Sequence, residues 1–284
     1  MKPELGIIGG SGLYEMDGLT DIEQIDYDTP FGKPSSPIMI GTLNEKRVAF
    51  LARHGLGHFL MPTEVNYRAN IFALKALGAT KVVSISAVGS LKEDYAPGHI
   101  IVPDDLFDFT KANRAQTFFG GGVVGHISVA EPFCSKLAKT TYDAVKKTSA
   151  QTHFGGTLIT IEGPRFSTKA ESNIFRSWGI SLIGMTACPE AFLAKEAELC
   201  YATMAHVTDY DVWHESEEAV TVEMVIETLR KNVHHAQDAI RNIVETLDSS
   251  HNCEGVAAGA IMTAPGAMNH QTKRKLETLY KKYF

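Results

Sequence analysis

The sequence predicts an α/β fold built around a central mixed or parallel β-sheet. Short runs rich in β-branched residues alternate with longer segments of helical periodicity, which is typical of α/β proteins. Several runs are apolar almost throughout, which favours strands that are buried on both faces of the sheet. The chain of 284 residues contains no internal repeat and no low-complexity linker. We therefore expect a single domain over residues 1–284, in which residues 255–284 form a C-terminal helical extension.

The β-branched runs predict the strands. In chain order they cover residues 5–9, 37–41, 47–52, 81–88, 99–103, 156–161, 180–185 and 201–208.

Amphipathic segments between and after these runs predict the helices. They cover residues 62–79, 128–148, 168–179, 189–200, 221–247 and 270–284. Pro62 and Thr63 are a start signal for the first helix, with Glu64 in its first turn and Gly78 as its stop. Residues 248–255 are the most linker-like break, and we expect the terminal helix beyond them to be exposed or to serve as a partner arm.

Composition and charge exclude several classes of function. A formal net charge of -6 gives no electrostatic reason to expect a nucleic-acid partner. We find neither a secretory leader nor an apolar segment long enough to span a membrane, so we expect a cytoplasmic protein. The cysteines lack the spacing of a metal site or a disulfide framework, and we expect buried free thiols and no metal. They are Cys134, Cys188, Cys200 and Cys253.

A glycine-rich stretch, "GIIGGSGLYEM", closes the first predicted strand. Glycines allow backbone N–H groups to approach an anion closely, and the Ser11 hydroxyl adds a further donor. The glycine order matches neither the dinucleotide fingerprint nor a Walker A loop. The stretch therefore indicates either a phosphate-binding loop or an ordinary glycine-rich turn.

Two further strand ends carry groups that suit an anion. Arg53 and His54 follow the run 47–52, and Ser86 with the Ala87 backbone lies near the end of the run 81–88. Because ligands of α/β sheets bind beyond the carboxyl ends of strands, these groups and Ser11 are candidates for one anion site without lysine or metal. Alternatively, Arg53 and His54 make only local hydrogen bonds at a strand end.

Asp209 and Asp211 follow the last predicted strand. Their spacing of two places both carboxyl groups on the same side of an extended chain. Paired acids perform general acid–base chemistry, because the proximity of like charges raises the pKa of one of them. A helix cap with a solvated neighbour is the alternative.

Other candidates lie at two further strand ends. Met185 and Thr186 close the run 180–185, where methionine indicates either packing or contact with a sugar or base. Ser167 and Thr168 follow the run 156–161 and are placed to cap the next helix.

Taken together, these segments resemble the 5′-methylthioadenosine phosphorylases of the trimeric purine nucleoside phosphorylase family. The resemblance extends in order from Gly6 to about Ile226 and lies in "GIIGGSGLY", "RHGLGH", "PTEVNYRANI", "SAVGSL", "AEPFC", "TIEGPRFSTKAES", "MTACPE" and "ATMAHVTDYDVW". It implies a partly barrel-like sheet and phosphorolysis of the purine N9–C1′ bond without metal or organic cofactor, inorganic phosphate being a co-substrate.

The same resemblance implies roles for individual residues. Phosphate would be held by Ser11, Arg53, His54, Ser86, the Ala87 amide and Thr186. Asp209 would hold or deliver the proton at purine N7, Asp211 would accept from the 6-amino group, Ser167 would line the base pocket, and Met185 would pack on the ribose.

The resemblance also places an apolar 5′-methylthio pocket at Val222, Val225 and Ile226. His126 would reach this pocket from a neighbouring subunit of a homotrimer, possibly within a dimer of trimers. Leu276, Leu279 and Tyr280 are candidates for a C-terminal contribution to a neighbouring site.

Two other functions are considered. A phosphorylase of 6-oxopurine nucleosides, such as methylthioinosine, inosine or guanosine, would share the phosphate site, but Asp211 favours a 6-amino group because a carboxylate cannot donate to an oxo group. A non-catalytic nucleotide-binding regulator, or a dehydrogenase, would bind without phosphate-dependent turnover.

Overall fold

The computed structural model describes residues 2–284 except 112, 215–220, 249 and 251–252. The strands are β1 (Leu5–Gly9), β2 (Thr20–Ile25), β3 (Ile38–Leu43), β4 (Lys46–Ala52), β5 (Lys81–Ser90), β6 (Ile100–Val102), β7 (Asp105–Phe109), β8 (Thr152–Phe154), β9 (Thr157–Ile161), β10 (Leu182–Gly184) and β11 (Cys200–Asp209). The α-helices are α1 (Tyr67–Leu77), α2 (Ser135–Val145), α3 (Lys169–Ser177), α4 (Ala187–Glu196), α5 (Val222–Thr246) and α6 (His270–Tyr280). Short 3-10 helices, η1 to η3, cover Ser11–Leu13, Pro265–Ala267 and Lys281–Tyr283.

The strands form one mixed, largely parallel sheet that branches at β5. Its main path runs β2-β3-β4-β1-β5-β10-β9-β7, and a second arm continues from β5 through β11 and β6 to β8. Parallel pairs join β1 to β4 and β5, and β11 to β5, whereas β10 is antiparallel to β5. In the described residues the two arms diverge without closing a barrel. The α/β fold expected from the sequence is confirmed.

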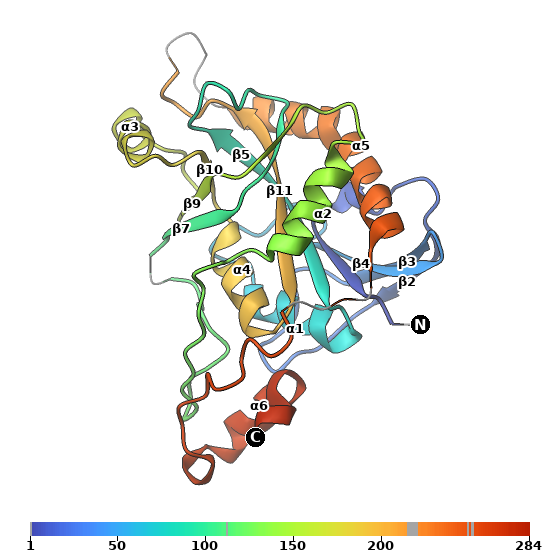
Figure 1. Ribbon diagram of the computed structural model, residues 1–284, viewed down its shortest axis with the longest axis vertical. Helices are drawn as coiled ribbons and strands as arrows, with labels where there is room; N and C mark the ends of the chain where they lie inside the picture. The colour runs from blue at the N-terminus through green and yellow to red at the C-terminus, as the bar shows by residue number, and fades with distance from the viewer. Residues whose placement is uncertain (1, 112, 215–220, 249, 251–252) are drawn as a thin grey trace.

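Helices cover both faces of this sheet. Along the central strands, side chains alternate between two cores: Ile8, Val82 and Tyr201 face α1 and α4, whereas their neighbours Ile7 and Val83 face α2 and α5. Figure 1 shows α2 and α5 together on one side of β11. The alternation follows from the two-residue period of a strand, and burial of both faces explains the nearly continuous apolar runs.

Every run predicted as a strand overlaps a strand of the structure, but three strands were missed. These are β2, β7 and β8, which each pair with only one neighbour. Their residues are mostly exposed or only half-buried, with no fully buried position among them. An edge strand needs no apolar run, which is why hydrophobic patterning did not identify them.

Helix ends agree less closely with the predictions. The helix α1 begins after Asn66, whose side chain accepts a hydrogen bond from the Ala69 amide, and not at Pro62 and Thr63. Its end at Gly78 is confirmed, and this residue has the positive φ of 116° that glycine tolerates best. For α3, Thr168 forms a capping box with Glu171.

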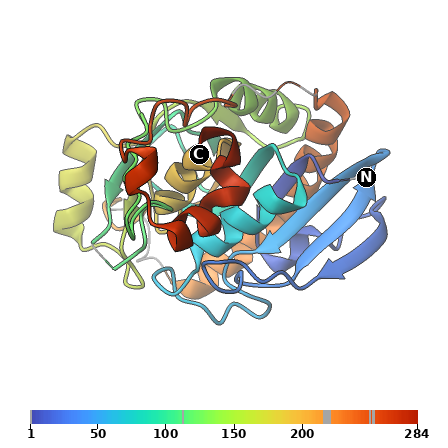
Figure 2. The same cartoon turned by 90° about the horizontal axis from the view of Figure 1, so that it is seen from below.

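The C-terminal helix α6 packs on the domain instead of being an exposed arm. Leu276, Leu279 and Tyr280 are buried in the core that includes α1 and α4, and Figure 2 shows α6 beside α1. The Tyr280 hydroxyl donates to the Glu196 carbonyl at 3.0 Å. The proposal that these three side chains reach a neighbouring site is therefore wrong, because each fills its own subunit's core.

The cysteines are free and buried, as expected. Their scatter in sequence does not persist in space, however. The sulfur atoms of Cys134, Cys200 and Cys253 all lie within 4.8 Å of one another. Spacing rules missed this cluster because they detect only ligands that are close along the chain.

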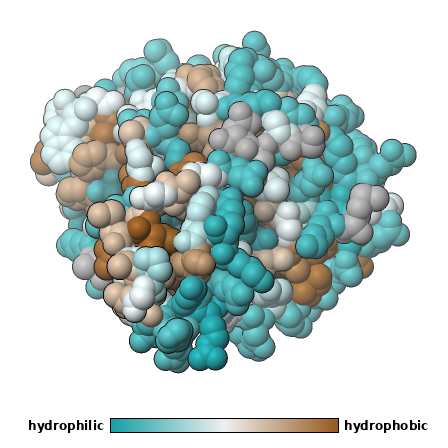
Figure 3. Space-filling view, turned by 60° about the horizontal axis from the view of Figure 1, so that its bottom comes forward, coloured by the Kyte–Doolittle hydropathy of each residue, from teal (hydrophilic) through white to brown (hydrophobic). Residues whose placement is uncertain are grey.

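The surface is consistent with the composition. Figure 3 shows one face on which hydrophilic residues predominate and apolar residues form smaller patches. Among the described residues, no helix combines the length and apolarity that crossing a membrane would require.

Candidate active site

A cavity of about 860 Å³ lies at the carboxyl ends of the central strands. It gathers residues from segments that are far apart in the sequence, as expected for ligand sites of α/β sheets. The predicted site residues that line it are Arg53, His54, Ser86, Ala87, Ser167, Met185, Thr186, Asp209, Asp211 and Ile226.

The branching of the sheet opens this cavity. One edge of β5 pairs with β1 as far as Ser84 and with β10 only from Gly89 onward. Between these two ladders, Ser86 and Ala87 face the cavity along an interrupted edge. Backbone groups on this stretch are therefore available to a ligand, which supports the expected role of the Ala87 amide.

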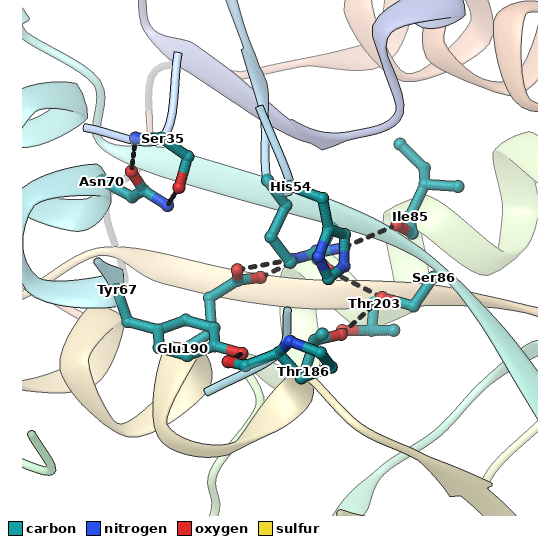
Figure 4. A network of polar contacts seen from close by, with 12 residues as sticks. Ser35, His54, Tyr67, Asn70, Ile85, Ser86, Thr186, Glu190 and Thr203 are labelled. Atoms are coloured by element: carbon teal, nitrogen blue, oxygen red, sulfur yellow. Dashed lines mark hydrogen bonds and ion pairs between the residues drawn. The ribbon is translucent and has the colours of Figure 1, made fainter. Parts of the chain in front are cut away.

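Arg53 is buried and paired with a carboxylate that the sequence analysis did not identify. Its Nε and Nη2 donate to the two Glu190 oxygens at 2.8 and 3.0 Å, and it also donates to Ser84 Oγ and the Ile85 carbonyl. Burial lowers the pKa of Arg53, but the charge and hydrogen bonds of Glu190, with smaller contributions from Tyr201 and Tyr67, together raise it above its ordinary value, so the guanidinium stays charged. Figure 4 shows this network around Glu190. The arginine fork expected for an oxyanion is thus bound by Glu190.

These four hydrogen bonds leave one of the five guanidinium N–H groups of Arg53 without an acceptor among the described residues. Arg53 lines the cavity, so this N–H is its remaining donor for a ligand. The positive charge is rigidly placed, because Glu190 is itself fully buried and also accepts from the Tyr201 hydroxyl at 2.8 Å.

His54 is held as a neutral imidazole. Its Nδ1 lies 2.8 Å from the Leu60 carbonyl, which can only accept, so Nδ1 carries the proton. Burial, together with the charge of Arg53, lowers the pKa of His54 to about 4. The free Nε2 is therefore an acceptor near neutral pH, suited to the P–OH group of a phosphate monoanion or dianion.

Hydroxyl groups complete the polar end of the cavity. Ser86 Oγ lies 3.5 Å from both Ser84 Oγ and Thr186 Oγ1 (Figure 4). Ser11 begins η1 next to the lining residues Gly10 and Gly12, but its side chain is not among the described atoms. Donor hydroxyls thus gather around Arg53 without a lysine in the cavity lining.

The paired acids lie in one wall of the cavity. Asp209 Oδ2 accepts from Thr208 Oγ1 at 2.6 Å, and Oδ1 accepts from the Asp211 amide at 2.8 Å. Burial raises the pKa of Asp209 to about 6, and burial also raises the pKa of Asp211. Gly89 permits this packing, because a Cβ there would lie 2.9 Å from Asp209 Oδ1.

Three buried oxygen atoms beside this wall make no hydrogen bond of good geometry within the described part of the chain, although Ser172 and Ser167 lie close enough to Asp211 to lower its pKa. The three atoms are Asp211 Oδ2, Ser167 Oγ and Ser172 Oγ. Buried polar atoms are normally hydrogen-bonded, and Asp211 and Ser167 line the cavity, so their remaining hydrogen-bonding capacity is available to a polar ligand there. Ser167 therefore belongs to the cavity, whereas Thr168 alone caps α3.

The residues expected at the 5′ end are only partly described. Ile226 lines the cavity and is 44% exposed. Val222 and Val225 belong to α5, but their side chains lie outside the described atoms. His126 is exposed on the segment between β7 and α2 and is not among the residues lining this chain's cavity.

Of the described lining residues that were not predicted, two carry unpaired polar groups. Both ring nitrogens of His206 and the Asn232 amide nitrogen are buried and unpaired in the described structure. Burial and, second, His235 lower the pKa of His206 to about 4. The sequence signal that could have identified His206 is that a histidine lies inside the otherwise largely apolar run 201–208.

Arg114 is a second buried arginine that the sequence analysis missed. It donates to the carbonyl groups of Glu162, Met185 and Cys188 and to the Glu162 carboxylate. Met185 lines the cavity. Arg114 therefore fixes the chain that carries Met185 and Thr186.

Replacing Arg114 by methionine should lower the free energy of unfolding by about 3–5 kcal/mol, because buried acceptors and a charge lose their partner. Denaturant unfolding followed by circular dichroism measures this. Arg165→Met, which breaks the exposed pair with Glu171, is the matched control and should change stability little. Equal stability of the two variants would contradict the role given to Arg114.

Comparisons with known proteins agree with this geometry. The family described as "Phosphorylase superfamily" matches residues 4–245. S-methyl-5'-thioadenosine phosphorylase of Geobacter sulfurreducens is 50% identical over 285 residues and covers 100% of both chains. The enzyme of the same name from Koribacter versatilis is 49% identical, covering 100% of this chain and 98% of its own.

Solved structures give the same result. A methylthioadenosine phosphorylase from an antarctic soil metagenomic library is 44% identical with a TM-score of 0.93, over 98% of this chain and 99% of that one. Methylthioadenosine phosphorylase from Schistosoma mansoni in complex with adenine is 35% identical with a TM-score of 0.86, over 93% and 100% of the two chains.

Proposed function

Because the chain belongs to the phosphorylase superfamily, we propose that it cleaves 5′-methylthioadenosine with inorganic phosphate, giving adenine and 5-methylthioribose 1-phosphate. The observation that carries this proposal is one cavity holding both a cationic, hydroxyl-rich end and a pair of buried acids. The cationic, hydroxyl-rich end suits phosphate, and the pair of buried acids suits a purine base. The identity of the nucleoside is inferred from the relatives, which are named S-methyl-5'-thioadenosine phosphorylase and match this chain over nearly their full length.

At the polar end, phosphate is bound by the remaining Arg53 N–H, the hydroxyls of Ser86 and Thr186, the Ala87 amide and Ser11. His54 Nε2 accepts a hydrogen bond from the P–OH group of phosphate, so the site favours a protonated phosphate species. Held in this way, the anion faces C1′ as the glycosidic bond loosens and stabilises the positive charge that develops on the sugar.

At the acid end, Asp209 acts on the leaving purine. Its raised pKa of about 6 keeps roughly a tenth of the carboxyl groups protonated at pH 7. Proton donation to N7 lets adenine leave as a neutral base, which is general acid catalysis. Asp211 Oδ2 accepts from the 6-amino group, Ser167 contacts the base, and Met185 packs on the ribose.

The 5′ end decides which nucleosides react. Ile226 gives the described wall an apolar side chain, and the family resemblance assigns Val222 and Val225 to the same pocket. Val222→His should shift kcat/KM toward 5′-hydroxyl nucleosides such as adenosine, because a polar group replaces an apolar contact. The ratio of kcat/KM for adenosine and 5′-methylthioadenosine measures the shift. Val222→Leu is the control and should keep the wild-type preference. An unchanged ratio of kcat/KM in Val222→His would show that Val222 does not contact the 5′ group of the substrate.

A 6-oxopurine phosphorylase is the second candidate, because burial raises the pKa of Asp211 and a protonated Asp211 can donate to an oxo group. The test is base release from 5′-methylthioadenosine, methylthioinosine and inosine, each with and without phosphate. We expect phosphate-dependent adenine release with the thio-substrate favoured. Activity confined to 6-oxopurines would overturn the role of Asp211, and release without phosphate would overturn the phosphate site.

The assembly proposed with this function is a homotrimer that works without a metal or organic cofactor in catalysis and is located in the cytoplasm. Support for shared sites comes from the exposure of His126, away from its own cavity. An aromatic patch of Phe107, Phe109 and Trp178 is also exposed on β7 and next to α3. Light scattering after size-exclusion chromatography measures the subunit number, and a monomer would exclude a contribution of His126 from a neighbour.

A further inference from the structure

Three cysteines from distant segments meet far from the candidate active site. Cys134 precedes α2, Cys200 begins β11, and Cys253 follows α5. All three are buried, and their sulfur atoms lie within 4.8 Å of one another. Tetrahedral zinc with Zn–S bonds of about 2.3 Å holds its sulfur ligands about 3.8 Å apart. Side-chain movements of an ångström or less would therefore bring the three thiolates to a common ion.

A buried cation beside the cluster independently indicates an anionic group there. Lys81 is the register partner of Cys200 on the neighbouring strand β5, and both line a small cavity with Cys134. The Lys81 ammonium is buried and has no hydrogen-bond partner within the described structure. A buried ammonium without a partner is costly, and a bound anionic complex would compensate its charge.

Charge distinguishes among soft metal ions. Three thiolates and a divalent ion together carry one negative charge, which the single positive charge of Lys81 balances. With a monovalent ion such as Cu⁺ the same set would keep one uncompensated negative charge. The other lysine of this cavity, Lys136, already pairs with Asp248 and Ser250.

The cavity also accommodates a fourth ligand. Its volume of about 20 Å³ is sufficient for one water molecule.

We propose that Cys134, Cys200 and Cys253 bind one zinc ion as thiolates, with water as the fourth ligand and Lys81 as the balancing cation. The ion would be structural, because Cys200 and Asp209 lie at opposite ends of the ten-residue strand β11, about 30 Å apart. It would tie the start of α2 and the chain after α5 to the base of the central sheet.

The test uses the full-length protein, reduced and freed of metal with a chelator, then titrated with Zn²⁺ and with Co²⁺. We expect one ion per chain, a higher midpoint of thermal unfolding and thiolate-to-cobalt charge-transfer absorption. Cys253→Ser should abolish stoichiometric binding. Cys188→Ser, which removes the buried thiol outside the cluster, should leave binding intact. Lys81→Met should weaken zinc binding about 10–100-fold.

A measurement on the wild type avoids dependence on variants that fail to fold. X-ray absorption at the zinc edge should count three sulfur ligands and one oxygen or nitrogen ligand. Absence of stoichiometric zinc binding, a count of fewer than three sulfur ligands, or equal zinc affinity of wild type and Cys253→Ser would each overturn the proposal.

Discussion

Replacing Asp209 by asparagine is expected to lower kcat for phosphate-dependent cleavage of 5′-methylthioadenosine by roughly 10²–10⁴-fold, the usual contribution of a general acid. The substitution keeps the shape of the side chain. The amide oxygen still accepts from the Asp211 N–H, and the amide nitrogen can donate to Thr208 Oγ1. The loss therefore reports the transferable proton and not the packing. Steady-state kinetics at saturating phosphate measures it.

The pH profile tests the same role. Burial raises the pKa of Asp209 to about 6, so the protonated acid is abundant below that pH and is lost as the pH rises through it. In wild type, kcat/KM should fall tenfold per pH unit on the alkaline side of this pKa, and Asp209→Asn should lack this limb. Asp28→Asn, at an exposed surface acid, is the matched control. An identical alkaline limb in wild type and Asp209→Asn would assign it to another group.

The second large effect is expected from Glu190→Ala. Removing this carboxylate leaves the Arg53 guanidinium charged and buried and deprives the Tyr201 hydroxyl of its acceptor. Breaking a buried ion pair on one side costs about 3–5 kcal/mol, and each kcal/mol lowers Tm by about 2–4 °C in a chain of this size class. We expect a clear loss of thermal stability together with a higher KM for phosphate.

A double variant separates the two consequences. Arg53→Leu with Glu190→Leu removes both charges, and such apolar replacements of buried pairs are often neutral or stabilising. Its Tm should exceed that of Glu190→Ala, while phosphate-dependent turnover stays low because the fixed cation is gone. Recovery of turnover along with stability would show that Arg53 serves the fold alone. Differential scanning fluorimetry and phosphate saturation kinetics provide the two readouts.

The sequence predicted those elements whose burial imposes a pattern. The central strands are apolar almost throughout and the helices are apolar at regular spacing, whereas β2, β7 and β8 lie at sheet edges and need neither pattern. Most candidate residues of the cavity were found because they follow strand ends. Ile226 and His126 were assigned through the family resemblance, and only Ile226 lines the cavity of its own chain.

Residues that act through long-range contacts could not be predicted. Glu190 and Arg114 are buried charged side chains whose partners lie 137 and 48 residues away, and nothing local in the sequence reports their burial. The cluster of Cys134, Cys200 and Cys253 was missed for the same reason. The three sulfur atoms come together only after α2, β11 and the chain beyond α5 have packed.

The gap between the β1 and β10 ladders on β5 provides a place for a ligand, but it also interrupts the hydrogen bonding of the sheet. Had β1 and β10 met, the backbone between Ser84 and Gly89 would be paired along both edges, and no cavity would open beside Ser86 and Ala87. A continuous ladder would gain cohesion but would lose the place where an anion is bound. Substitutions that draw the two arms together should therefore be selected against even where they stabilise the fold, because stability and activity compete here for the same backbone groups.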